Sequence, residues 1–227
     1  MTARFLLFAL SRPHAVSNAT WKKFYTHEHI NDLVSNRVVR NGAFYEQFPN
    51  PLGRIPPDNK TFLAMYETDF ARCLHTDNFT KGEVKTTSGL FPNNGGPEDV
   101  ADLDVRNYEL VEIFNPNGVE LNTPPAPYLY EAEVEPADIE EFHRFYREDH
   151  AAMMAKHRGY RRTLHYRLTA TEGKPQEAPN SILVIHEFTS FADVGSATTW
   201  ATMETPFARK VLPRVKSMKT RTLKLVL

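Results

Sequence analysis

One short stretch occurs twice in this chain, and this repetition limits the possible folds more than any other feature. Phe-Tyr-Thr-His-Glu-His at residues 24–29 matches Phe-Tyr-Arg-Glu-Asp-His at residues 145–150. Both copies read Phe-Tyr, three residues, His, and their first residues, 24 and 145, are 121 positions apart. Two copies at this distance in a chain of 227 residues predict two similar halves.

Both copies have the spacing of an amphipathic helix. At 3.6 residues per turn, each copy places one titratable side chain in an otherwise apolar stripe. The two stripes consist of Trp21, Phe24, Tyr25, His29 and Leu33, and of Phe142, Phe145, Tyr146, His150 and Met153. A histidine in such a stripe is either a core residue that bonds a carbonyl or a functional group beside a cavity. The pattern leaves both roles open.

The composition argues against several classes of function. Hydrophobic residues at 41% and charged residues at 24% are ordinary for a globular protein, and a net charge of −1 disfavours nucleic acid or a membrane as partner. The apolar run at residues 5–10 is short for a signal peptide and is interpreted as a first strand. Cys73 is the one cysteine, so no internal disulfide can form and a reducing, cytoplasmic location is expected.

Each half has the pattern of strand, helix, two strands, helix and strand. In the first half we expect strands at residues 4–10, 43–48, 61–68 and 108–114, one helix beginning near Trp21, and another from Asp69 to about Phe79. Residues 81–99 form a long polar insertion with an apolar tip at Leu90-Phe91. Because it is too long for a passive turn, we interpret it as a lid over a cavity.

The second half repeats this order after a linker rich in proline. We expect strands at residues 128–134, 160–168, 181–189 and 220–227, and helices capped by Asp138 and Thr205. The predicted organisation is an N-terminal repeat at 1–115, a linker at 116–127 and a C-terminal repeat at 128–227.

This β-α-β-β-α-β order is that of the ferredoxin-like unit, an α+β arrangement whose helices cover one face of the sheet. The other face must also be buried. Two tandem halves can set their sheets against each other and form an internal, pseudo-dimeric α+β barrel around a central apolar cavity. We therefore expect either a monomer that is complete in itself or a homodimer.

The sequence resembles the dimeric α+β barrel superfamily, and within it the fungal EthD-type proteins. The resemblance rests on aromatic-rich helices ending in Glu28-His29 and Asp149-His150, on Gly159-Tyr160 opening a strand, and on the order of elements. Relatives implied by it include polyketide cyclases and decarboxylases, natural-product isomerases, quinone-forming monooxygenases that need no cofactor, and haem enzymes. The chain has no repeated metal-ligand pattern, so we expect no metal and no cofactor. The insertion departs from the compact family pattern.

The resemblance implies that the helix histidines, His29 and His150, point toward a cavity mouth. A histidine of near-neutral pKa can take and return a proton without a cofactor. Tyr25 and Tyr146, one turn earlier, would donate to a developing oxyanion, and packing is their alternative role.

Two adjacent pairs on the third strand of each half are further candidates. His186 and Glu187 match Tyr66 and Glu67, and strand alternation lets only one member of each pair face the cavity. The catalytic candidates are His150, His29, His186, Tyr146 and Tyr25. The substrate-binding candidates are Tyr66, Glu187, Trp21, Phe142 and Phe91. His150 with His186 and Tyr146 is preferred, because proton-handling groups concentrate in the C-terminal half.

The leading functional hypothesis is a cofactor-independent lyase or isomerase of natural-product, polyketide-like metabolism. Acid–base chemistry by histidine and tyrosine in an apolar barrel cavity would cyclise, isomerise, dehydrate or decarboxylate a small, apolar, oxygenated substrate. A cofactor-free quinone-forming monooxygenase is the alternative among enzymes. A non-catalytic, stress-related protein that binds small molecules in the same cavity is the alternative outside them.

Overall fold

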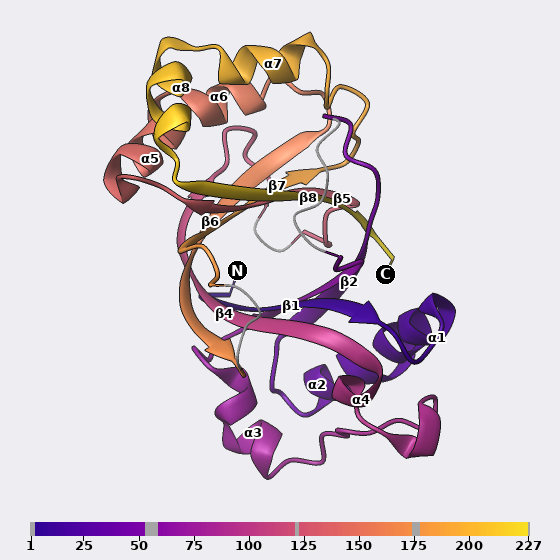
Figure 1. Ribbon diagram of the computed structural model, residues 1–227. Helices are drawn as coiled ribbons and strands as arrows, with labels where there is room; N and C mark the ends of the chain where they lie inside the picture. Colours follow the sequence, from indigo (N-terminus) through magenta and orange to yellow (C-terminus); the bar gives the residue numbers. More distant parts are fainter. Residues whose placement is uncertain (1–2, 53–58, 121–122, 174–177, 227) are drawn as a thin grey trace.

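Strands with apolar side chains on both faces form a sheet that closes on itself. The computed structural model describes residues 3–52, 59–120, 123–173 and 178–226 (Figure 1). The strands are β1 (Phe5–Pro13), β2 (Asn41–Gln47), β3 (Phe62–Thr68), β4 (Ala101–Phe114), β5 (Tyr128–Glu135), β6 (Tyr160–Glu172), β7 (Ile182–Phe188) and β8 (Ser217–Leu225). All are antiparallel to their neighbours in a closed barrel with the order β1-β3-β2-β8-β5-β7-β6-β4.

The barrel order confirms the predicted fold class. The first half supplies β4-β1-β3-β2 and the second supplies β8-β5-β7-β6, so each half has the strand order of a ferredoxin-like unit. The halves join where β2 pairs with β8 and where β4 pairs with β6. A barrel closed by one chain is what the prediction of a self-sufficient monomer requires, and that prediction stays open.

Helices lie outside the barrel, with those of the two halves at opposite ends of the view in Figure 1. They are α1 (Asn18–Lys23), η1 (Phe24–His29), α2 (Ile30–Ser35), α3 (Asp77–Thr80), α4 (Pro97–Val100), α5 (Ile139–Phe145), η4 (Tyr146–His150), α6 (Ala151–Met154), α7 (Ala197–Met203) and α8 (Pro206–Val211). Short 3₁₀ turns occur at η2 (Cys73–His75), η3 (Pro92–Asn94) and η5 (Leu212–Arg214). No helix in the described part of the chain is long and apolar enough to cross a membrane.

Capping residues explain where several of these helices begin. The side chains of Ser17, Asp138 and Thr205 accept hydrogen bonds from backbone N–H groups in the first turns of α1, α5 and α8. The predicted caps at Asp138 and Thr205 are thus confirmed.

The expectation of one helix from Asp69 to Phe79 is wrong. The Asp69 carboxylate binds Arg40 instead of capping a helix, and the segment contains only η2 and α3. Sequence reasoning also missed α7, which begins after Ser196 in a threonine-rich stretch with weak helical preference.

Strand alternation sends one set of side chains into the barrel and the other toward the helices. The inward set forms one apolar cluster with members from all eight strands, including Leu6, Tyr45, Leu63, Tyr108, Leu129, Leu164, Leu183 and Leu223. The interior is therefore a packed core with a pocket at one end, rather than the open central cavity expected from the sequence. Among the described residues, the outward set packs on the helices in three further clusters.

Buried charges lie inside the barrel next to this core. Glu131 and Glu133 on β5 are fully buried, and Arg221 on β8 donates through Nη1 to both, at 2.8 Å each. Arg106 on β4 of the other half, 3% exposed, donates through Nη1 to Glu133. Burial raises the pKa of Glu131 to about 7, against the lowering effect of Arg221. The network therefore joins the two halves through paired charges.

The Arg106 pair is expected to stabilise the barrel strongly. Arg106→Met leaves Glu133 with one cationic partner fewer, and breaking a buried pair in this way costs about 3–5 kcal/mol of unfolding free energy. Urea unfolding at pH 7.5 measures the loss. Arg4→Met is the matched control, because Arg4 is largely exposed in its pair with Glu109 and its removal should cost under about 1 kcal/mol. Similar losses in both variants would contradict a structural role for the buried network.

Candidate functional site

Each repeated motif forms a turn of π-helix inside a longer helix. The first motif helix consists of α1, η1 and α2, and the second of α5, η4 and α6. A π-turn inserts one extra residue and re-aims the side chains around it, and such turns are frequent at functional sites. His29 and His150 are the last residues of the two π-turns, so both halves place a histidine at the same local distortion.

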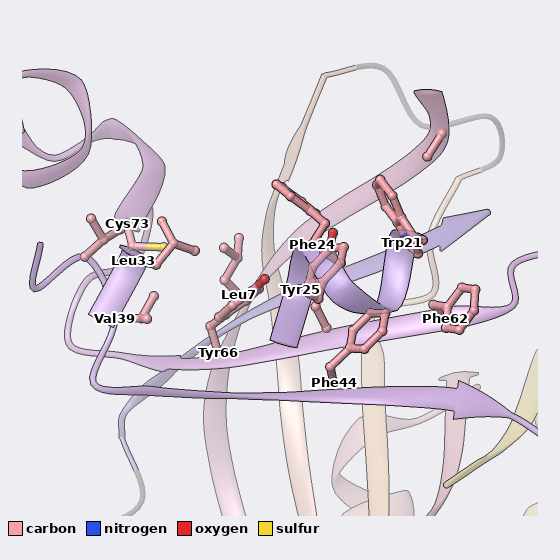
Figure 2. Packing of buried hydrophobic residues seen from close by; sticks show 14 of the residues in the cluster. Leu7, Trp21, Phe24, Tyr25, Leu33, Val39, Phe44, Phe62, Tyr66 and Cys73 are labelled. Atoms are coloured by element: carbon pink, nitrogen blue, oxygen red, sulfur yellow. The ribbon is translucent and has the colours of Figure 1, made fainter. Parts of the chain in front are cut away.

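A cavity of about 280 Å³ lies between the first motif helix, the outer face of the sheet and the insertion. Its lining residues are Leu7, Ala9, Tyr25, His29, Leu33, Tyr66, Leu74, Phe79, Lys85, Thr86, Pro97, Glu98, Leu103 and Val105. Figure 2 shows Leu7, Tyr25 and Tyr66 gathered between this helix and the strands. The cavity is outside the barrel wall, on the helix side of the N-terminal half. The sequence had predicted the reaction site in the barrel interior instead.

Three candidate side chains surround this cavity. The His29 ring centroid lies 5.4 Å from that of Tyr25 and 6.1 Å from that of Tyr66, and it is nearly perpendicular to both rings. The Nδ1 atom of His29 and the hydroxyl of Tyr66 are buried without a hydrogen-bond partner among the described residues. A buried polar group left unpaired costs about 1–3 kcal/mol, which a ligand oxygen or hydroxyl bonded to it would offset.

Burial sets the protonation of this trio. Loss of hydration lowers the pKa of His29 to about 4, and the nearby Asp32 carboxylate offsets only part of that effect. Burial also raises the pKa of Tyr25 and of Tyr66. At neutral pH the site therefore holds a neutral imidazole, able to accept a proton, beside two protonated phenols, able to donate hydrogen bonds.

The insertion covers this side of the motif helix and is fastened to it. Ser88 donates to the Glu28 carboxylate at 2.6 Å, and the backbone N–H of Lys85 donates to Asp32 at 2.6 Å. Lys85 lines both the inner cavity and a polar surface groove of about 400 Å³ that also includes His29. The position of the insertion fits the predicted lid, with Lys85 and His29 between the two spaces.

Two aromatic substrate-binding candidates of the first half, Trp21 and Phe91, lie outside the cavity. Trp21 is fully buried and donates through Nε1 to Ser11 at 3.1 Å. Phe91 packs with its ring centroid 4.6 Å from that of Phe24 and 5.7 Å from that of Trp21. Neither Trp21 nor Phe91 belongs to the lining of the 280 Å³ cavity, so both support the helix and the insertion from behind.

The matching residues of the C-terminal half pack directly against one another. The ring centroid of His150 lies 4.6 Å from that of Tyr146 and 5.8 Å from that of His186, and all three residues are buried. His186 Nδ1 lies 2.7 Å from the Thr163 hydroxyl, and its Nε2 lies 3.5 Å from the Tyr146 hydroxyl. Phe142 stacks on the ring of His165 in the same cluster. The structure thus brings the preferred trio together, in a densely packed environment.

Strand alternation separates the remaining candidates. His186 and Tyr66 point to the helices, whereas Glu187 and Glu67 point into the barrel, where both line a pocket at one end. Sequence reasoning missed His165 and His143, whose Nδ1 atoms lie 3.1 Å apart in the C-terminal cluster. Because β6 pairs with both β4 and β7, His165 lies in the interior of the sheet and is fully buried.

Comparison with known proteins shows the fold. No protein-family model and no curated protein matches the chain. An anthrone oxidase-like protein of known structure has a TM-score of 0.55 at 9% identity, covering 99% of this chain and 92% of its own. A provisionally assigned monooxygenase of Fusobacterium nucleatum has a TM-score of 0.54 at 11% identity, covering 100% and 94%. A dye-decolorizing peroxidase of Bacteroides thetaiotaomicron has 0.51 at 8%, covering 99% and 94%.

The chain has the dimeric α+β barrel fold, with both ferredoxin-like halves in one polypeptide. The narrower resemblance to the EthD-type proteins stays a prediction. The described residues contain no group of three or more His, Cys, Asp or Glu side chains placed to hold a metal ion.

The buried histidines are expected to make folding stability depend on pH. Burial lowers the pKa of His29 and His150 to about 4 and that of His165 and His186 well below the usual value, whereas unfolded histidines titrate near ~6.5. The unfolded state then binds more protons between these values, so stability should fall as the pH drops from about 6.5 toward 4. Each histidine contributes up to about 1.4 kcal/mol per pH unit.

Urea unfolding at pH 7.5, 6 and 5 measures this slope, and His150→Gln should flatten it. Glu131 acts in the opposite direction, because its raised pKa removes stability as the pH rises from about 4.5 to about 7. The four histidines outweigh this single carboxyl. Stability that is constant or higher at pH 5 would show that the histidines stay hydrated or become protonated in the folded state.

Proposed function

We propose that the protein is an enzyme that moves protons on a small, largely apolar, oxygenated molecule held beside His29, Tyr25 and Tyr66. The observation that carries the proposal is the pair of unpartnered buried atoms, His29 Nδ1 and the Tyr66 hydroxyl, at an apolar cavity. Most of the wall consists of aliphatic and aromatic side chains, which favour an apolar ligand body and exclude water.

In enolisation, the three side chains have separate roles as hydrogen-bond donors and general base. Tyr66 or Tyr25 donates a hydrogen bond to the substrate carbonyl oxygen, which becomes an oxyanion when His29 removes a proton from the adjacent carbon. The pKa of His29 lies below neutrality, and the negative charge that forms beside it raises that pKa as the proton arrives. The proton then returns to another carbon in an isomerisation, or to an alkoxide after the enolate has attacked a second carbonyl in a cyclisation.

This assignment places the reaction in the lyase and isomerase classes and uses only side chains of the chain itself. It moves the leading site to the N-terminal half, where the cavity and the insertion are. The preference for His150 that came from the sequence remains a competing proposal, since each of the two histidines is the last residue of a π-turn.

A substrate-independent assay compares the two histidines. Proton exchange in deuterium oxide, followed by NMR on anthrone and on small 1,3-diketones, measures enolisation whatever the natural substrate. His29→Gln should lower the exchange rate by about two to four orders of magnitude, because glutamine keeps hydrogen-bonding capacity but does not titrate. Loss in His150→Gln with normal exchange in His29→Gln would transfer the site to the C-terminal half, provided circular dichroism shows both variants folded.

A cofactor-free, oxygen-using enzyme is a second candidate, favoured by the fold likeness to an anthrone oxidase-like protein. In that reaction the same deprotonated carbon reacts with dioxygen, so that a CH₂ group and O₂ give a carbonyl group and water without an external reductant. Oxygen uptake with anthrone, equal in amount to the quinone formed and lost in His29→Gln, would support it. Enolisation without oxygen uptake would support the lyase or isomerase class. Ligand binding without either would indicate a carrier.

A further inference from the structure

A separate pocket of about 190 Å³ lies at one end of the barrel interior, where the two halves face each other. Side chains from β2 and β3 of the first half and from β6 and β7 of the second line it, and Pro124 and Pro125 of the linker border it. It is on the opposite side of the sheet from the His29 cavity, because Glu67 and Tyr66 are adjacent on β3 and point to opposite faces. The two spaces are therefore distinct.

Most residues that line the pocket have an equivalent in the other half, because the two halves are related by an approximate twofold axis. Strand pairing places Asn41 opposite Glu67 in the first half and Arg162 opposite Glu187 in the second. By the same strand pairings, Ala43 of the first half is equivalent in position to Leu164 of the second. Met65 is likewise equivalent to Ile185, and Tyr45 to Tyr166. Each half thus contributes one carboxylate, one phenol and apolar side chains to the pocket. The main polar difference is that the first half has the amide of Asn41 where the second has the guanidinium of Arg162.

In the second half, the guanidinium group of Arg162 has a hydrogen-bond donor without a partner among the described residues. Arg162 is 4% exposed and forms a fork with Glu187, through Nε at 2.8 Å and Nη2 at 3.1 Å. Its Nη1 is buried without a hydrogen-bond partner among the described residues, although Arg162 lines the pocket. An unpaired N–H of a charged group is costly, so an acceptor atom supplied by a ligand would be stabilised there.

The amide side offers an acceptor. Glu67 is partly buried and accepts a hydrogen bond from Asn41 Nδ2 at 3.1 Å, and a carboxylate can accept about four. Glu187 pairs with Arg162 and also lies 3.7 Å from Nε of Arg161, so two guanidiniums share this carboxylate, whereas Glu67 has a hydrogen bond from Asn41. The two carboxylates and the two guanidiniums therefore balance, and the lining favours an uncharged ligand that donates a hydrogen bond to Glu67.

We propose that this barrel-end pocket is a second binding site, for a small uncharged molecule with a hydrogen-bond acceptor at Arg162, a donor at Glu67 and an apolar body between them. Ala43, Leu164, Met65 and Leu6 contact the body, and the hydroxyls of Tyr45 and Tyr166 lie in the same lining. The volume is below the ~300 Å³ of drug-sized sites, so the ligand has about the size of one substituted ring. This site does not depend on the reaction proposed at His29.

Calorimetric titration with 4-hydroxybenzamide tests the site, because this probe has a phenol donor at one end and a neutral carbonyl acceptor at the other. Ala43→Leu fills the middle of the pocket with the side chain of its counterpart Leu164, and Glu67→Gln exchanges the carboxylate for an amide. Each variant should raise the Kd by about tenfold or more, equal to ~1.4 kcal/mol. His29→Gln is the matched control and should leave the Kd unchanged.

Two related probes test the chemical class. Benzamide lacks the donor, and 4-hydroxybenzoate replaces the neutral acceptor with an anion, so both should bind more weakly. Tighter binding of 4-hydroxybenzoate would overturn the charge argument. Absence of binding of 4-hydroxybenzamide at millimolar concentration, an unchanged Kd in folded Ala43→Leu and Glu67→Gln, or a loss confined to His29→Gln would each overturn the site. If Ala43→Leu does not fold, Glu67→Gln alone decides.

Discussion

The pairing of buried charges inside the barrel is the constraint on which the joining of the two halves depends. Strand pairing places Phe8 and Leu10 of β1 in the first half at the positions that Glu131 and Glu133 of β5 have in the second. Arg106 and Arg221 also hold matching positions, and both donate to Glu133. Because carboxylates in a packed apolar interior need cationic partners, the second half requires an arginine from the first. The two halves are thus not independent units that happen to touch.

Barrel closure also determines where cavities remain. Inward side chains fill the core, so the larger candidate cavity lies on the outer face, between strands and helices. The halves differ there: residues 81–99 separate α3 from β4 in the first half and supply Lys85, Thr86, Pro97 and Glu98 to the cavity. In the second half His165, His186, His150 and Tyr146 pack ring against ring. The same motif therefore borders an open space in one half and a filled one in the other.

The sequence was sufficient for the order of strands, the caps at Asp138 and Thr205, and the two-half architecture, because these depend on local periodicity and on backbone hydrogen-bond donors. It could not decide which of Tyr66 and Glu67 points to the helices and which points into the barrel, since alternation defines two faces but does not identify them. Nor could it show that His165 is buried, because an edge strand and a strand that pairs on both sides in a closed barrel have the same local pattern. The predicted helix from Asp69 does not form, and the Asp69 carboxylate pairs instead with Arg40, 29 residues away in the sequence.

Joining the two halves in one polypeptide has a consequence for the barrel-end pocket that a symmetric pair of identical chains cannot share. In such a pair, every residue at the pocket would occur twice, and a ligand would find two equivalent orientations. Here Asn41 faces Arg162 across the approximate axis, so the two ends of the pocket differ in charge and in donor number. A molecule with unlike ends can therefore bind in one direction only, because the two halves of a single chain can differ where identical subunits cannot.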